Sequence, residues 1–493
     1  MKKFIYGFIV TLVFSSSLFA TEPVPGNSFN AKMRWLDANA QTGGNYLVEI
    51  DMDQSLAPMV FSYGNRKNIN IIFKDIGQKV KINQNANGTM FIIESGITLV
   101  LDGNIELQGG RINNASLIRV NSGGIFIMND GKITNNNFSI SGAPYGGGIY
   151  VAGSFTMNGG EITGNTSTNT FSSYSSSKSY GGGVYIDSNG NFTMNGGLIA
   201  NNKTSSYETH YGGGVYVTKN GTFIMNGGKI SNNDSQNGAG LFIDENGSFT
   251  MNNGEISANS NENSCKGGGL FVRGRFIMSN GIISKNIATY SNGGGVFVSD
   301  YGSFILRGGE ISGNTSTSTS FGSRNFGGKG GGIYIEENAR FIMEDGVISG
   351  NRADNGGGVF ACSSIVFTMN NGKISANTAY RGGGLYLDSG RAFIINSGEI
   401  SGNIVSSYGA GVYVNGGEFT KNGGIIFGYA ENDRNSNIVR ASSVIQKNRG
   451  HAVYINHSNG LYIMGMDAKA DSNNKLSFNG VRNPPVFNGE WDF

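Results

Sequence analysis

Residues 181–202 read GGGVYIDSNGNFTMNGGLIANN, and the chain repeats this stretch with small changes. Close copies are GGGVYVTKNGTFIMNGGKISNN at 212–233, GAGLFIDENGSFTMNNGEISAN at 238–259 and GGGVFACSSIVFTMNNGKISAN at 356–377. Each copy holds three short pieces in which apolar residues alternate, and glycine, Asn-Gly or Asn-Asn ends each piece. Because these endings are turn signals, we expect every piece to be a short β-strand.

The spacing of the copies predicts the architecture. The shortest spacing between successive GGG or GAG motifs is 26 residues, and the motifs begin at positions 146, 181, 212, 238, 267, 293, 330, 356, 382 and 409. Three short strands in every turn, with each turn in register with the next, are typical of a parallel β-helix, and its crossovers are almost always right-handed. We therefore predict an all-β, right-handed parallel β-helix of about 12–14 rungs, capped at both ends.

Alternation along the strands predicts the core. Val184, Ile186, Phe192, Met194 and Ile199 are expected to point inward, whereas Tyr185 and Thr193 point outward. The inward phenylalanine recurs in every rung and should form one continuous ladder. The asparagines of FxMN and IxxN fall at turns, where stacked side-chain amides can form hydrogen-bonded ladders.

Composition supports a solenoid and excludes some partners. The chain has 493 residues and 80 glycines but only six prolines, and its glycines recur at fixed offsets, which argues against collagen and low complexity. Because 36 Lys and Arg residues face 34 Asp and Glu residues, no basic stripe indicates nucleic-acid binding.

The ends of the chain differ from the repeats. Residues 1–20 combine Lys2 and Lys3, a short apolar run and Ala20, which is typical of a signal peptide. We expect residues 21–59 to form an N-terminal cap, with a short helix within 30–44, and residues 60–467 to form the β-helix. Residues 468–493 are expected to form a C-terminal cap or tail. After residue 20 no apolar segment is long enough to be a transmembrane helix, so the mature chain is expected to be exported, either secreted or held on a bacterial cell surface or outer membrane.

The repeats resemble those of a known family. GGGI or GGGV followed by FTMN, FIMN or FIIN is similar, over roughly 120–425, to the GGA[ILV] and FxxN repeats of chlamydial polymorphic outer-membrane proteins. That resemblance implies a right-handed β-helix passenger that acts as an adhesin. The third residue of the first motif is usually glycine here, and the stretch after the last rung is too short for that family's translocator barrel. The closing VFNGEWDF, with Phe487, Trp491 and Phe493, is expected to be either a capping strand or a barrel-like sorting signal.

A catalytic site is not indicated by the residues. Pectate lyases and polygalacturonases share this fold, and their sites need carboxylates aligned across neighbouring rungs. The best candidates are Asp187, Asp244, Glu336 and Asp388, but Asp187 and Asp244 lie two rungs, about 10 Å, apart. That separation is at or beyond the limit for an inverting pair, so turn-forming acids are the simpler interpretation. His210, His451 and His457 show no metal-ligand spacing, and we expect no catalytic residues, metal or cofactor.

Insertions at one corner are the candidate binding surface. Nearly all extra residues lie between IxxN and the next GGG, as in 166–180, 204–211 and 315–329, and loops confined to one corner make one face. Their expected anchors are aromatic or arginine residues, namely Tyr174, Tyr180, Tyr207, Tyr211, Phe321, Arg324 and Phe326. Two alternatives stay open: the insertions are passive, or the outward aromatic after each GGGV binds instead, unless the insertions cover it or it stacks on itself.

Three functions follow from these patterns. The first is an adhesin-like protein without catalysis that binds extracellular or host macromolecules, protein or glycan. The second is a polysaccharide lyase or hydrolase of the pectate-lyase-like class, and the third is a purely structural surface protein. The sequence does not indicate an oligomeric state. Cys265 and Cys362 fall at different corners, three rungs apart, so no disulfide is expected.

Overall fold

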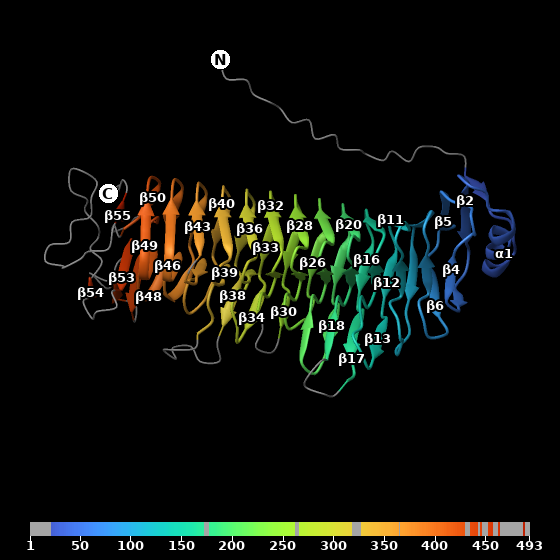
Figure 1. Ribbon diagram of the computed structural model, residues 1–493, viewed down its shortest axis with the longest axis horizontal. Coiled ribbons are helices and arrows are strands. Elements are labelled where there is room, and N and C mark those ends of the chain that lie inside the picture. Colours follow the sequence, from blue (N-terminus) through green and yellow to red (C-terminus); the bar gives the residue numbers. More distant parts are fainter. Residues whose placement is uncertain are drawn as a thin grey trace, which may run out of the picture.

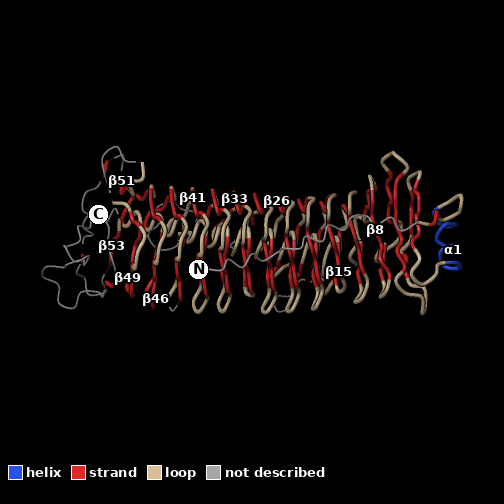
Figure 2. The backbone as a smooth tube through the Cα atoms, turned by 90° about the horizontal axis from the view of Figure 1, so that it is seen from above, coloured by secondary structure: helices blue, strands red, loops and turns tan. Residues whose placement is uncertain are grey.

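The computed structural model describes residues 21–171, 177–261, 266–317, 327–363, 365–428, 434–441, 444–445, 452–456, 462–463 and 487–488. It is a parallel β-solenoid of about 13 turns, which confirms the predicted β-helix. Figure 1 shows the turns stacked into a straight rod, and Figure 2 shows the same rod turned by 90° with the helix α1 at one end.

Each rung contributes strands to three main columns. The first column contains β4 (Met59–Phe61), β7 (Phe91–Ile93), β10 (Ile118–Val120), β14 (Ile149–Val151), β19 (Val184–Ile186), β24 (Val215–Val217), β27 (Leu241–Ile243), β31 (Leu270–Val272), β35 (Val296–Val298), β39 (Ile333–Ile335), β42 (Val359–Ala361), the beginnings of β46 (Leu385–Ile395) and β49 (Val412–Lys421), and β53 (Val453–Asn456).

The second column contains β2 (Asn45–Ile50), β5 (Ile69–Asp75), β8 (Ile97–Asp102), β11 (Ile125–Met128), β15 (Ser154–Met157), β20 (Asn191–Met194), β25 (Thr222–Met225), β28 (Ser248–Met251), β32 (Arg275–Met278), β36 (Ser303–Leu306), β40 (Arg340–Met343), β43 (Val366–Met369) and the ends of β46 and β49. Short strands extend these columns at the ends: β1 (Glu22–Pro23) pairs with β2, β54 (Tyr462–Ile463) with β53 and β55 (Phe487–Asn488) with β49.

The third column is a separate 14-stranded sheet. It contains β3 (Gln54–Leu56), β6 (Val80–Gln84), β9 (Ile105–Gln108), β12 (Lys132–Thr134), β16 (Glu161–Thr163), β21 (Leu198–Ala200), β26 (Lys229–Ser231), β29 (Glu255–Ser257), β33 (Ile282–Ser284), β37 (Glu310–Ser312), β41 (Val347–Ser349), β44 (Lys373–Ser375), β47 (Glu399–Ser401) and β50 (Ile425–Ile426).

The sequence prediction missed a fourth, interrupted column after the buried asparagine of IxxN. It contains β13 (Asn137–Ile140), β17 (Thr166–Asn169), β22 (Lys203–Ser205), β30 (Ser260–Asn261), β34 (Ile287–Thr289), β38 (Thr315–Thr317), β45 (Thr378–Arg381), β48 (Ile404–Tyr408) and β51 (Ile438–Ala441), which pairs with β52 (Val444–Ile445). Parts of the insertions read as loops are therefore strands, because they stack in register on one another.

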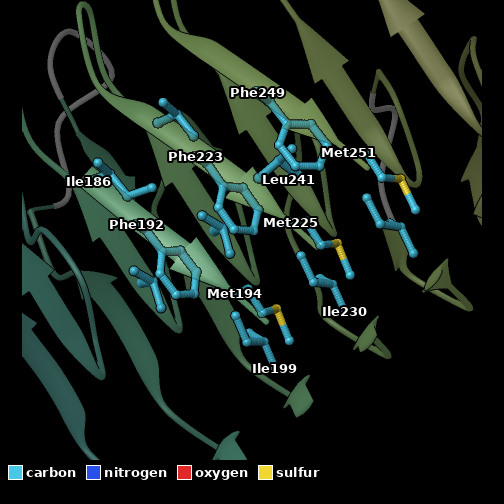
Figure 3. Close-up of a cluster of buried hydrophobic side chains, with 14 of the residues drawn as sticks. Ile186, Phe192, Met194, Ile199, Phe223, Met225, Ile230, Leu241, Phe249 and Met251 are labelled. Atoms are coloured by element: carbon cyan, nitrogen blue, oxygen red, sulfur yellow. The ribbon is translucent and has the colours of Figure 1, made fainter. Parts of the chain in front are cut away.

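The core matches the predicted alternation. Val184, Ile186, Phe192, Met194 and Ile199 are buried, and Figure 3 shows their equivalents lying side by side in successive rungs. The inward phenylalanines form a ladder from Phe126 to Phe419, with neighbouring ring centroids 4.5–5.3 Å apart. Stacking gives each rung the apolar contacts that its own few side chains do not supply.

Two asparagine ladders run beside this core. The buried one joins equivalent asparagines of successive rungs from Asn136 to Asn437, with side-chain amide distances such as 3.0 Å between Asn259 Nδ2 and Asn286 Oδ1. The exposed one joins the FxMN asparagines, for example Asn195 Nδ2 to Asn158 Oδ1 at 2.8 Å. Both ladders confirm the expectation from the turn positions.

A helix closes the N-terminal end of the core. Helix α1 (Phe29–Asn39) begins after Ser28, whose side chain accepts a hydrogen bond from the Ala31 N–H. Its Phe29, Met33 and Leu36 are buried in the same cluster as the first rungs. No helix in the described ranges is long and apolar enough to cross a membrane.

Candidate functional site

The insertions at 137–145, 166–180 and 203–211 build a three-rung projection, which we call the fin. Its strands β13, β17 and β22 continue the fourth column, and β18 (Lys178–Tyr180) pairs in parallel with β23 (Thr209–Tyr211). Figure 1 shows these strands projecting from the lower edge of the rod. The described part of the fin is thus a stacked β structure, which holds its residues in fixed positions.

The interior of the fin is polar, in contrast to the core. The Ser167 hydroxyl donates to the Pro144 carbonyl at 3.0 Å, and the Thr204 hydroxyl donates to the Ser235 hydroxyl at 2.8 Å. The Asn169 side chain donates to the Lys178 carbonyl at 3.1 Å and accepts from the Phe171 N–H at 2.8 Å. Hydrogen bonds, together with burial of Phe138 in the first rung, therefore hold the two layers of the fin together.

The outer end of the fin carries exposed aromatic side chains. Phe171 follows β17 and is 43% exposed, and Tyr207 follows β22 in the next rung and is 53% exposed. The backbone beside Tyr207 is held by a 2.9 Å hydrogen bond from the Glu208 N–H to the Ser177 hydroxyl. Exposed aromatic side chains on adjacent rungs are candidates for interface anchors, because aromatics are enriched among the residues that supply most binding energy.

Tyr180 and Tyr211 are half-buried and pack against other aromatic side chains. They stack on each other at 5.5 Å between ring centroids, and Tyr145 continues the stack at 5.4 Å. Their rings also lie edge-on against the outward aromatics of the first column, for example Tyr180 against Tyr216 at 5.0 Å. These two candidates therefore cover other side chains, whereas Tyr207 is presented to solvent.

The remaining predicted anchors lie outside the described residues: Tyr174, Phe321, Arg324 and Phe326.

The outward aromatics after GGGV form a second, buried ladder. Ten of them, from Tyr185 to Tyr454, make up a separate hydrophobic cluster, and Tyr150 packs against it. The rings of this ladder stack on each other and are covered by other residues, so stacking of a sugar on them is not supported. This arrangement matches the alternative in which the insertions cover the outward aromatics. Towards the C-terminal end cations provide the cover: Lys266 Nζ lies 4.9 Å from the Phe297 ring centre, and Lys329 Nζ lies 4.7 Å from that of Phe360.

One sequence signal for this cover was missed. The covering residue stands immediately before the GGG motif, where several repeats hold an aromatic or cationic side chain, namely Tyr180, Tyr211, Lys266, Lys329 and Arg381, and three others hold asparagine. Recurring aromatic and cationic side chains at one position indicate a residue that lies over an aromatic ring.

The acids considered for catalysis have structural partners. Asp187 accepts a hydrogen bond from the Tyr150 hydroxyl, and Asp244 accepts one from the Tyr216 hydroxyl at 2.8 Å. Burial, followed by the bond to Asp187, raises the pKa of Tyr150 to about 12, so this hydroxyl stays a donor at neutral pH. Glu336 lies 3.1 Å from Lys266 Nζ and 3.0 Å from the Ser299 hydroxyl. Each of these acids therefore binds a side chain of a neighbouring rung or a residue that covers the aromatic ladder.

Of the two cysteines, only Cys362 lies in the described ranges. Cys362 is a free thiol that donates to the Tyr334 hydroxyl at 2.9 Å, and burial raises its pKa to about 11. Cys265 lies outside the described residues, so the pairing of the two cysteines stays a prediction. No group of three or more His, Cys, Asp or Glu side chains in the described ranges is placed to hold a metal ion.

The fin contains a buried histidine that makes it sensitive to acid. Burial lowers the pKa of His210 to about 4, and the neutral ring accepts the Gln236 N–H at Nδ1 over 2.9 Å. The unfolded pKa is about 6.5, so this contribution to stability is complete above pH 6.5 and is lost as the pH falls towards 4. Between pH 7 and pH 5 we expect a loss of about 2 kcal/mol, measured as lower protection factors of the fin amides, that is, exchange rates relative to the intrinsic rate at each pH.

A matched variant separates this effect from carboxylate protonation. In His210→Gln the side-chain oxygen can still accept from Gln236, but the side chain does not titrate, so the protection factors of the fin amides should be similar at both pH values. Equal acid sensitivity in the variant and the parent chain would contradict a role for His210.

Comparison with known proteins identifies no relative of this chain. No family model, no curated protein sequence and no solved structure matches this chain.

Proposed function

We propose that the chain is an exported, non-catalytic β-helix protein that binds extracellular macromolecules through the fin, as an adhesin does. The observation that carries this proposal is the pair of exposed aromatics, Phe171 and Tyr207, on adjacent rungs of an ordered projection. Export rests on the signal peptide expected at 1–20, and the adhesin class on the resemblance of the repeats.

The partition of polar and apolar side chains supports a binding role. In the fin the hydrogen-bonding groups of Ser167, Thr204 and Asn169 face inward, whereas large apolar groups face solvent. Within the same insertions, Tyr180 and Tyr211 are half-buried against other aromatics, whereas Phe171 and Tyr207 are 43% and 53% exposed. Aromatic anchors commonly supply most of the energy of a protein interface, because they bury much area for few rotatable bonds.

The test is binding of the double variant Phe171→Ser/Tyr207→Ser to an array of glycans and extracellular-matrix proteins. We expect at least a tenfold loss of affinity for whichever ligand the parent chain binds, since truncating one anchor commonly costs more than about 1 kcal/mol. Circular dichroism should be unchanged, because both side chains are exposed.

The matched control is Tyr301→Ser, which removes a 78% exposed tyrosine from a turn between the first two columns. This variant should bind as the parent does. Undiminished binding by the fin variant would contradict the proposal, and so would turnover of a polysaccharide that Asp187→Asn or Asp244→Asn abolishes.

A further inference from the structure

The outward side of the second column forms a flat face from β11 to β49. Eleven strands stack here in register, from Phe126 to Phe419. We call the outward residues of these strands, together with the residue that follows each strand, the flat face. Neither of its two bordering turns carries an insertion comparable to the fin, and Figures 1 and 2 show that the rod is straight along this stretch.

Only β-branched residues occupy the central line of the flat face, and most of them are half-buried: Ile127, Thr156, Thr193, Ile224, Thr250, Ile277, Ile305, Ile342, Thr368, Ile394 and Thr420. β-Branched side chains have few rotamers, so ordering them in an interface costs little entropy. The line is therefore suited to close packing against another rigid surface.

Charge is scarce on the flat face. The outward positions of β11, β15, β20, β25 and β28, with the asparagines that follow them, are all uncharged. Among the described side chains, charged residues occur in the next three rungs, as Arg275, Arg307, Arg340 and Glu344. These charges lie in the middle rungs but at the two edges of the face, whereas its central line is uncharged, and low charge at the core of a patch is typical of a protein interface.

We propose that two copies of this chain pair side by side through their flat faces, parallel and in register. The two-fold axis then runs along the rod, so each rung meets the same rung of the second copy. This axis exchanges the two edges of the face. The outward residue that begins a strand, such as Arg340, therefore lies opposite the residue that directly follows the same strand in the partner, such as Glu344. The central line meets itself, isoleucine against isoleucine and threonine against threonine.

The charges favour this arrangement over the antiparallel one. In the parallel pair Arg340 lies opposite the partner's Glu344, and Arg275 lies opposite the partner's Ser279, so no like charges meet. Glu344 also accepts from Arg307 Nε at 3.1 Å within its own chain, which holds it in place. An antiparallel pair with full overlap would instead place Arg275 against the partner's Arg275, and like-charge contacts disfavour wrong pairings.

The area is sufficient for a stable dimer. Eleven strands at about 4.8 Å give a length of about 50 Å, and a four-residue strand gives a width of about 13 Å. The pair would bury about 1,300 Å² in total, which lies within the range of specific interfaces, about 1,200–2,000 Å². The uncharged rungs alone would supply less than half of this area, so pairing needs the full length.

Cross-linking tests the register directly. Thr156→Cys, Thr250→Cys and Thr368→Cys are introduced singly into a chain that carries Cys265→Ser and Cys362→Ser. Packed sheets lie about 10 Å apart, so a bismaleimide of that reach should cross-link each variant to a dimer. Val347→Cys, on the third column, is the control and should stay monomeric. Cross-linking at one central position only, or at none, would overturn the parallel pairing.

Charge reversal gives the second test, with the dimer measured by sedimentation. Arg340→Glu faces the partner's Glu344 twice in the two-fold pair, so we expect the dissociation constant to rise at least about tenfold. Arg275→Glu reverses the same charge on the same face and should change it little. Arg275→Ser would remove a like-charge contact only in the antiparallel pair, so a strengthened dimer for that variant would indicate antiparallel pairing, and a parent chain that is monomeric at every concentration would refute the proposal.

Discussion

Replacing Asn259 by alanine is expected to lower the free energy of unfolding by about 4 kcal/mol. Asn259 is fully buried, and its Oδ1 accepts the backbone N–H and the side-chain amide of Asn233, both at 3.0 Å. Its Nδ2 donates to the Ile230 carbonyl and to Asn286 Oδ1, also at 3.0 Å. Alanine would leave the Asn233 N–H and the Ile230 carbonyl without these partners in a site that excludes water.

The matched control lies in the same rung. Asn252 belongs to the exposed ladder and donates to Asn226 Oδ1 at 2.8 Å, but water can replace that bond. Asn252→Ala should therefore cost less than about 1 kcal/mol. Guanidinium unfolding followed by circular dichroism measures both variants, and equal losses would show that the buried ladder has no special weight.

Replacing Gly269 by alanine is expected to destabilise the rod by about 3 kcal/mol. Gly269 is the third glycine of its GGG motif, and a Cβ there would lie 2.5 Å from the Gly295 carbonyl oxygen and 2.9 Å from Asn286 Nδ2. The clash involves backbone of the next rung and a member of the buried asparagine ladder. Neither can move without breaking hydrogen bonds on both sides.

The neighbouring glycine provides the comparison. Gly268 is the middle residue of the motif, and a Cβ there would lie 2.6 Å from the Ile287 carbonyl oxygen, but two other repeats hold a fully buried alanine at the equivalent position, Ala239 and Ala410. Because the rungs can shift to accept alanine at this position, Gly268→Ala should cost less than Gly269→Ala. The third position holds alanine only in the last repeat, as Ala452. A loss for Gly268→Ala as large as that for Gly269→Ala, measured by the same titration, would contradict this reading.

The fold was predictable because one unit recurs. The alternation of Val184, Ile186, Phe192 and Met194 fixes the inward side of a rung, and the 26-residue spacing fixes how rungs meet. The asparagine ladders followed from the same register. A chain without repeats offers no such check, because each strand would have to be placed by its own weak local signal.

The candidate site was predictable only in part. The corner was found from the lengths of the insertions, and Tyr207 is 53% exposed there. Tyr180 and Tyr211 lie half-buried against other aromatics, because composition does not distinguish an aromatic that binds from one that covers another aromatic. The strands within the fin were missed since runs such as TSTN carry no apolar alternation, and stacking on neighbouring rungs decides their conformation.

The equivalence of the rungs has a consequence for the length of the molecule. Each rung presents the same core side chains, the same buried asparagine and the same glycine turns to its neighbours, as the pairs Phe223 with Phe249 and Phe249 with Phe276 illustrate. Loss or gain of one complete 26-residue unit therefore leaves every ladder continuous and changes the reach of the rod by one step of about 4.8 Å. The length of the β-helix therefore changes only in whole rungs, and the number of rungs on either side of the fin sets its distance from each end.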